Sequence, residues 1–458
     1  MSQSNLETVN PAPVLPSRFP GIFRFFEPAP ARPVTITEPA ALDAAFRSWR
    51  VRVLMSSIAG YAVFYFVRKN LATAIPVMEQ DLHISQTVLG AYLSAHGVIY
   101  GISKFVNGFL GDRCNARAMM IGGLLGSAIL NLCFGFSNTV LALGLLWMFN
   151  GWFQGMGFPP CARLLTHWFP PKQMATKMSI WNTSHQIGAA LIVVLCGYLV
   201  VTSWRLCFIV PAVIALACCG FLFFILPDTP ASVGLPEVPG TETPPLAKDE
   251  TFGQEMMKLV FRNKYICLVS VANLFVYILR YSVFDWGTSY LTKAKHIQIT
   301  NASWMLFGFE ISGLVGALLA GWMTDRFLKG RAVRICVVYM LLAGISVALF
   351  WRASGQSAFF SSVLLCCCGF FIYGPQCLIA AIAANLATKR AAATAVGLTG
   401  LFGYGSTLFS GVGFGALVQH YGWDAGFGGL LGIAVAGTVL LLFAWRANAH
   451  GYQTESKV

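Results

Sequence analysis

The sequence is short of charge. Only 11% of its 458 residues are charged, whereas a soluble globular protein has roughly 25%. Hydrophobic residues make up 56% of the chain, and the mean hydropathy is +0.66. This balance excludes an ordinary soluble enzyme and predicts a protein that crosses a membrane many times. At about 20 apolar residues per span, the chain has room for about twelve transmembrane helices.

Signatures of several other protein classes are absent. The thirteen cysteines form no Cys-x-x-Cys pair and mostly lie in apolar runs, so we expect neither a metal site nor a disulfide framework. The Pro-rich N-terminal segment lacks the apolar core of a secretory signal peptide. No phosphate-binding loop, His-Glu-x-x-His helix or nucleophile elbow occurs, so we expect no enzyme activity, no ATP-driven pumping and no cofactor.

The charge that is present is mostly positive. The net charge is +13, and Lys and Arg gather before the first expected span and after the second and fourth. The positive-inside rule therefore accounts for the charge without a nucleic-acid partner. We expect an integral protein of the bacterial inner (cell) membrane, monomeric, with both termini cytoplasmic. The basic residues are Arg47, Arg50, Arg52, Arg113, Arg117, Arg163, Lys172 and Lys177.

The two halves of the chain repeat each other. Gly108–Arg113 and Gly321–Arg326 share the pattern Gly-x-x-x-Asp-Arg, and Arg68 and Arg280 each follow a tyrosine by three residues. The repeat predicts an all-α membrane protein with twelve transmembrane helices in two pseudo-symmetric six-helix bundles, which resembles the major facilitator plan. The expected divisions are a flexible cytoplasmic tail at 1–48, bundles at 49–226 and 264–446, a cytoplasmic linker at 227–263 and a cytoplasmic tail at 447–458.

Arg68 and Arg280 are the strongest candidates for a binding site. A charge inside the membrane costs about 2.5–3.5 kcal/mol on insertion scales, so a functional role is the default interpretation. The alternative for Arg68, near a helix end, is that it reaches the membrane interface. Two guanidinium groups facing one cavity suit a phosphate group, because each offers a planar fork to its oxygens.

Aromatic and polar residues near the arginines complete the expected substrate site. Tyr61 and Tyr65 share a helical face with Arg68, although packing at the membrane interface is an alternative role. A histidine can donate to phosphate, but a lone histidine in a membrane also serves as a helix–helix contact. The candidates are Tyr61, Tyr65, Lys69, Lys104, Trp181, Asn182, His185 and Tyr277.

Acidic residues inside apolar runs need partners. We expect Asp285 and Glu310 to act as counter-ions to Arg280, Lys69 or Lys104, in salt bridges that break and re-form during transport. Proton coupling through either acid is the rival interpretation. Two motifs at the cytoplasmic ends of the second and eighth spans are expected to pair charges between helices in one gate state: Asp112, Arg113, Asp325 and Arg326.

Several segments carry a family resemblance: Tyr65–Asn70, Gly101–Phe105, Gly151–Pro160, Trp181–His185, Tyr277–Tyr281, Tyr373–Pro375 and Gly400–Tyr404. Through them the chain resembles the organophosphate:phosphate antiporter family of the major facilitator superfamily, from about Trp49 to Trp445. The resemblance implies exchange of inorganic phosphate for a phosphate ester, with the two arginines as a clamp. It adds Tyr373, Tyr404 and Phe158 to the lining.

Details of the resemblance favour a glycerol-phosphate substrate. Hexose-phosphate members tend to carry Asp and Lys where this chain has Val396 and Thr399. The chain departs from the family pattern at Gln186, and Phe158 stands where glycerol-phosphate members often have Trp. The resemblance implies exchange of glycerol-3-phosphate for phosphate by a rocker-switch, alternating-access mechanism. Transport of hexose-6-phosphate or phosphoglycerate, and a hexose-phosphate sensor of a two-component system, are the alternatives.

Overall fold

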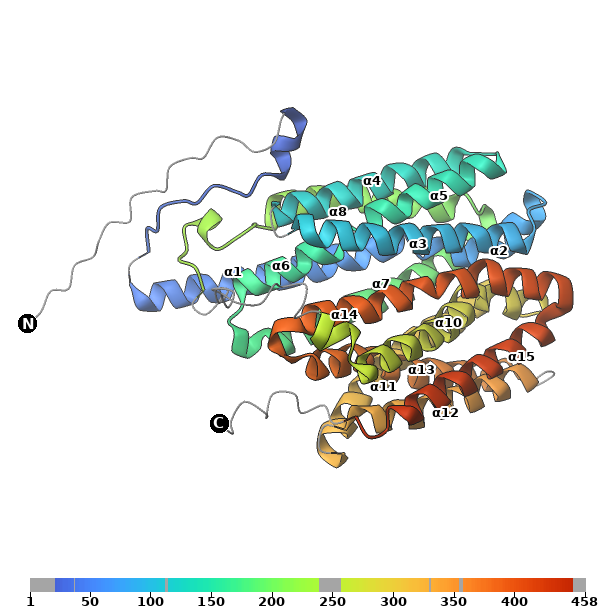
Figure 1. Ribbon diagram of the computed structural model, residues 1–458. Coiled ribbons are helices and arrows are strands. Elements are labelled where there is room, and N and C mark those ends of the chain that lie inside the picture. Colours follow the sequence, from blue (N-terminus) through green and yellow to red (C-terminus); the bar gives the residue numbers. More distant parts are fainter. Residues whose placement is uncertain are drawn as a thin grey trace, which may run out of the picture.

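The computed structural model describes residues 21–36, 38–111, 114–238, 257–328, 331–353 and 357–447. Within these ranges every regular element is a helix (Figure 1). The long helices lie alongside one another, with most of the first half, drawn in blue to green, on one side and the second half, in yellow to red, on the other. Helix α7 of the first half packs against α11 of the second.

The helices follow one another with short connections. The first half contains η1 (Gly21–Phe26), α1 (Pro39–Phe66), α2 (Asn70–Asp81), α3 (Gln86–Gly111), α4 (Ala116–Phe136), α5 (Val140–Gln154), α6 (Phe158–Trp168), α7 (Pro171–Thr202), α8 (Leu206–Ile225) and η2 (Ala231–Val233). The second half contains η3 (Met257–Phe261), α10 (Lys264–Lys293), α11 (Ile299–Phe327), α12 (Ala332–Arg352), α13 (Ala358–Leu386), α14 (Thr388–Gly405), η4 (Phe409–Gly413) and α15 (Phe414–Phe443).

Nine helical segments of the described chain are long and apolar enough to cross a membrane. The first, Pro39–Asp81, combines α1 and α2, and the last, Ala395–Phe443, contains two helices joined at Gly422. Gly422 has φ 80° and ψ 176°, a conformation open almost only to glycine, which lets the chain turn back there. Together with the less apolar α3 and with α5 followed by α6, the described helices account for the twelve expected crossings.

The first helix starts earlier than expected. Helix α1 begins at Pro39, so residues 39–48, which were expected in the flexible tail, are helical. Proline is well suited to the first turn of a helix, because backbone N–H groups there have no hydrogen-bond partner within the helix and proline has no N–H group. The tail residues 1–20 and the linker residues 239–256 lie outside the described residues, so the other domain boundaries stay predictions.

Close glycine contacts along α3 join the two halves. A Cβ atom added to Gly90 would lie 2.5 Å from the carbonyl oxygen of Gly411, and one added to Gly97 would lie 2.4 Å from Thr407. Both distances are shorter than a van der Waals contact allows. Helix α3 therefore packs with its backbone directly against the segment between α14 and α15, which is possible only with glycine there.

Polar contacts between the halves extend towards one face of the molecule. We call the face where α1 begins the terminal face, and the opposite one, where α2 ends, the far face. Lys293 forms an ion pair with Glu79 at the far face. Among the described residues, the hydrogen bond between the halves that lies nearest the terminal face joins Lys104 Nζ to the Tyr404 hydroxyl, at 3.0 Å. The described halves are therefore bonded to each other from mid-membrane to the far face.

A buried carboxylate connects three segments near the terminal face. Asp228, which directly follows the first bundle, accepts hydrogen bonds from the backbone N–H groups of Ala116 at 2.8 Å and Ala29 at 3.1 Å. Its carboxylate also lies 3.5 Å from Arg163 Nη1, and the Asp228 side chain is completely buried. The Asp228 carboxylate thus ties the N-terminal segment, the start of α4 and helix α6 to one point.

Replacing this carboxylate is expected to destabilise the protein strongly. Asp228→Ala leaves Arg163 without its partner and two backbone donors without an acceptor, a cost of about 3–5 kcal/mol for a buried ion pair. Asp228→Asn should cost less, because its amide oxygen still accepts. The melting temperature of the purified protein in detergent measures both effects. Glu38→Ala, which removes an exposed carboxylate, is the control, and an equal loss in that control would contradict the account.

Candidate functional site

A break in the first membrane span positions the first cation pair. Helix α1 ends at Phe66 and α2 begins at Asn70, so Arg68 and Lys69 lie in the turn between them. The turn frees the carbonyl oxygen of Val67, which accepts hydrogen bonds from the side-chain amides of Asn131 at 3.0 Å and Asn150 at 2.8 Å. These two amides replace the N–H group that would bond to Val67 in a continuous helix, since the core of the membrane offers no water to do so. Discontinuous helices of this kind form substrate and ion sites in transporters.

Arg68 lies among aromatic rings at the interface of the halves. Its guanidinium carbon is 3.9 Å from the centre of the Tyr100 ring and 5.3 Å from that of Tyr65. No carboxylate of the described chain lies within ion-pair distance of Arg68. Arg68 also lines a small cavity of about 30 Å³ between the halves, together with Lys69, His96, Trp147, Tyr281, Asp285 and Tyr404.

Arg280 occupies the corresponding place in the second half. It is only 4% exposed, and its Nε donates a hydrogen bond to the Tyr373 hydroxyl at 3.0 Å. Tyr373 in turn donates to Glu310 Oε1 at 2.5 Å. Glu310 therefore neutralises Arg280 through Tyr373, whereas a direct salt bridge was expected. A hydroxyl between the two charges leaves guanidinium N–H groups of Arg280 available to a ligand.

The second cation of the turn binds across the interface. Lys69 Nζ lies 2.6 Å from Asp285 Oδ1, and both side chains are about nine-tenths buried. Tyr281 and Phe284 place their rings 4.7 and 4.9 Å from the Lys69 ammonium group. Asp285 is thus the counter-ion of Lys69, one of the three partners considered for it. This ion pair links the break in the first span to α10.

Lys104 closes the site on the side of the terminal face. Besides its hydrogen bond to Tyr404, its ammonium group lies 4.1 Å from the centre of the Phe158 ring. Tyr404 also packs against Tyr100, with the ring centres 4.8 Å apart. Lys104 therefore contacts Phe158 of its own half and Tyr404 of the other half.

Most of the remaining expected residues pack against other residues of the site, and Asn182 is the exception. Tyr61 packs against Trp181 with ring centres 4.6 Å apart, and Tyr65 lies 5.8 Å from His185. Asn182 is exposed and reaches the site only through its backbone carbonyl, which contacts His185 Nδ1. In the second half the ring of Tyr277 packs at 6.1 Å from that of Tyr404.

The expected gate residues lie elsewhere. Asp112 and Arg113 are outside the described residues, Asp325 lies near the end of α11, and Arg326 is exposed there. Their pairing between helices stays a prediction.

Four residues of the site were missed from the sequence: His96, Tyr100, Trp147 and Tyr281. His96, Tyr100 and Lys104 are spaced by four residues and share one face of α3. Because Lys104 was already a candidate, this spacing could have pointed to His96 and Tyr100. His96 Nδ1 lies 3.1 Å from the Trp147 carbonyl oxygen. Because a carbonyl only accepts, Nδ1 carries the proton, and in the neutral form of the ring Nε2 is then an acceptor. Nε2 is buried and has no hydrogen-bond partner in the described chain.

Comparison with known proteins agrees with this architecture. Residues 58–411 match the family model of the Major Facilitator Superfamily. The chain is 36% identical over 441 residues to the glycerol-3-phosphate transporter of Bacillus subtilis, covering 93% of this chain and 99% of that protein. It is 37% identical over 451 residues to a probable hexose phosphate transport protein of Chlamydia trachomatis, covering 94% and 99%.

A solved structure shows the same fold. A bacterial homologue of the human lysosomal transporter Spinster, in an inward-facing and unoccupied conformation, superimposes with a TM-score of 0.66 at 17% identity, covering 88% of this chain and 96% of that one. The chain belongs to the organophosphate:phosphate antiporter family of the major facilitator superfamily, a superfamily of membrane transporters and not of enzymes.

The ion pair between Lys69 and Asp285 should contribute to stability as a unit. Lys69→Met and Asp285→Asn each leave one buried group without its partner, at a cost of about 3–5 kcal/mol, and the double variant should recover part of that loss. Melting temperatures of the three variants form the cycle. Glu79→Gln, which breaks a more exposed pair, should cost at most about 1 kcal/mol. Strictly additive losses for Lys69 and Asp285 would contradict this coupling.

Proposed function

We propose that this protein exchanges a phosphate ester for inorganic phosphate across the bacterial inner membrane. The observation that carries the proposal is the charge around the interface of the halves. Arg68, Lys69, Lys104 and Arg280 bring four positive charges, and two carboxylates oppose them. The resulting excess of two positive charges matches a phosphate group, which carries about −1.5 to −2 at pH 7.

The two arginines are suited to bind one phosphate group together. The Arg68 guanidinium carbon lies 5.3 Å from the centre of the Tyr65 ring, and that of Arg280 lies 5.6 Å from the centre of the Tyr281 ring. Both tyrosines interact electrostatically with both arginines, which supports a shared site. Each guanidinium can bind two phosphate oxygens side by side. A ligand held in this way contacts both halves of the molecule at once.

Bridging of the halves explains exchange. With the site empty, two like charges repel and disfavour a closed state, whereas a bound phosphate attracts both halves. A ligand must bind the favoured state about 10⁴-fold more tightly, or by about 5.5 kcal/mol, to move an equilibrium from 1:99 to 99:1. Two bidentate arginine contacts are of the right size for this. The terminal face is the cytoplasmic one in this proposal.

Glycerol-3-phosphate is the ester that we favour. The Bacillus subtilis relative is a glycerol-3-phosphate transporter, and Val396 and Thr399 occupy positions where hexose-phosphate members tend to have charged residues. The similar identity to a probable hexose phosphate transport protein makes hexose-6-phosphate the first competitor. Inhibition of phosphate uptake by glycerol-3-phosphate, glucose-6-phosphate and phosphoglycerate ranks the three. Phosphate-ester binding without any uptake would instead indicate a sensor.

Exchange of phosphate for phosphate in liposomes tests the clamp. Arg68→Lys and Arg280→Lys each keep the charge but lose the planar fork, so each should lower exchange by about 10- to 100-fold. Arg352→Lys, at an exposed position at the end of α12, is the matched control and should exchange at the rate of the unchanged protein. Exchange retained in both clamp variants would overturn the proposal.

His96 tests where the organic part of the ester binds. A neutral acceptor among cationic donors suits a hydroxyl group of the ester and offers nothing to phosphate oxygens. His96→Phe keeps an aromatic ring beside Trp147 but loses the acceptor. It should raise the KM for glycerol-3-phosphate about 3- to 10-fold, the value of one neutral hydrogen bond, with exchange of phosphate for phosphate unchanged. An equal effect on both substrates would show that His96 acts only through packing.

A further inference from the structure

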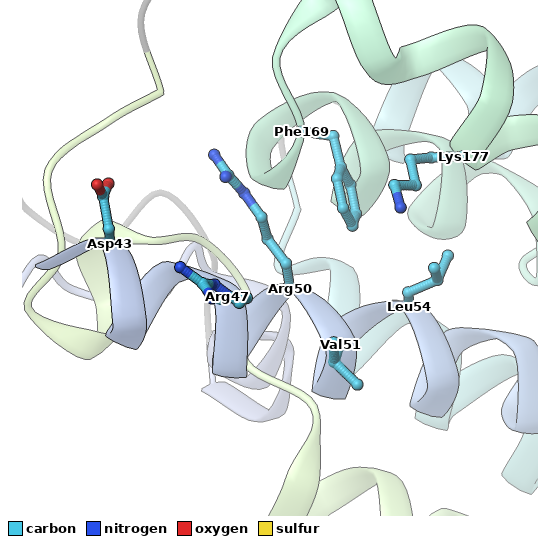
Figure 2. A pocket seen from close by; sticks show the side chains of 7 residues that line it. All are labelled: Asp43, Arg47, Arg50, Val51, Leu54, Phe169 and Lys177. Atoms are coloured by element: carbon cyan, nitrogen blue, oxygen red, sulfur yellow. The ribbon is translucent and has the colours of Figure 1, made fainter. Parts of the chain in front are cut away.

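A second cavity lies at the terminal-face end of α1. It measures about 320 Å³ and is lined by Asp43, Arg47, Arg50, Val51, Leu54, Phe169 and Lys177. Figure 2 shows the first five residues on one helix, with Phe169 and Lys177 opposite them. Arg50 and Arg68 are separated by roughly 25 Å of helix at 1.5 Å per residue, so this cavity is distinct from the site between the halves.

The cations of this cavity are held in place by neighbouring groups and can still bind a ligand. Arg50 Nε donates to the Trp168 carbonyl oxygen at 2.8 Å, which fixes the guanidinium group and leaves its other N–H groups for a ligand. The ring of Phe169 lies 6.0 Å from the Arg50 guanidinium carbon and 5.5 Å from Lys177 Nζ. In the described chain, none of Arg47, Arg50 and Lys177 forms an ion pair. With Asp43 as the acid of the described lining, the cavity has an excess of two positive charges.

An apolar strip continues from the cations along α1. Val51 and Met55 follow Arg47 at intervals of four residues, on the same helical face, and are 58% and 57% exposed. Leu54 adds an apolar side chain to the cavity itself. A small phosphate compound would use only the cations, whereas an amphiphilic ligand would use both the cations and the strip.

We infer that this cavity binds the headgroup of an anionic phospholipid, whose acyl chains follow Val51 and Met55. Basic pockets between transmembrane helices on the cytoplasmic side are suited to such headgroups, because the lipid phosphate lies at that depth. The cavity joins α1, which ends two residues before Arg68, to the start of α7, the helix that carries His185. The bound lipid therefore stabilises the first half of the molecule where its substrate-site helices enter the membrane.

Binding of defined lipids to the purified full-length protein tests the inference. Phosphatidylglycerol should stay bound in native mass spectrometry and raise the melting temperature, and phosphatidylcholine should do neither. The double variant Arg47→Gln/Lys177→Gln should weaken phosphatidylglycerol binding by roughly tenfold or more, since each basic residue near a membrane surface contributes about 1 kcal/mol. The control is Arg331→Gln/Arg446→Gln, which removes two exposed cations near the terminal face and should bind like the unchanged protein.

Three outcomes would overturn the lipid site. Equal retention of phosphatidylcholine would show general lipid adhesion, and equal weakening in the control variant would show an effect of overall charge. Displacement of the lipid by inorganic phosphate or soluble glycerol phosphate would show a small-anion site. Because the readout is lipid binding, failure here leaves the exchange activity untouched, and loss of exchange in the arginine variants leaves the lipid site untouched.

Discussion

The burial of positive charge in the middle of a membrane protein is the constraint on which this structure depends. A guanidinium or ammonium group there needs compensation, and the chain compensates its four cations unequally. Lys69 has a carboxylate in direct contact, and Arg280 has one behind a tyrosine. Among the described residues, neither Arg68 nor Lys104 has a carboxylate within ion-pair distance: Arg68 lies against the rings of Tyr65 and Tyr100, and Lys104 contacts the Tyr404 hydroxyl and the Phe158 ring. In the proposed function, this incomplete compensation is what allows the site to bind an anion.

The interface between the halves is built around the same charges. Glycines of α3 allow the backbones to meet closely on the far side of the site, and the Lys69–Asp285 and Lys104–Tyr404 contacts cross the interface beside the arginines. A ligand that competes for these cations changes the contacts that hold the halves together. Substrate binding and movement of the halves are therefore linked by the same side chains in the proposed exchange cycle.

Much of the architecture could be predicted from the sequence because hydropathy, charge asymmetry and the internal repeat are local properties. The two arginines stood out for the same reason. The break at Arg68 could not be predicted, since it depends on Asn131 and Asn150, which reach Val67 from other helices. The Tyr373 link to Glu310 and the acceptor state of His96 likewise follow from tertiary contacts. The early start of α1 was missed because Arg47, Arg50 and Arg52 mark the start of the apolar span, whereas the helix itself begins before them.

The central claim is that one phosphate group is held by both arginines. An experimental structure of the protein with bound phosphate tests it most directly. The account predicts N–H groups of Arg68 and of Arg280 within about 2.7–2.9 Å of oxygens of the same phosphate, the usual distance of a charge-assisted hydrogen bond. Phosphate bound to one arginine alone, or seated away from both, would contradict it.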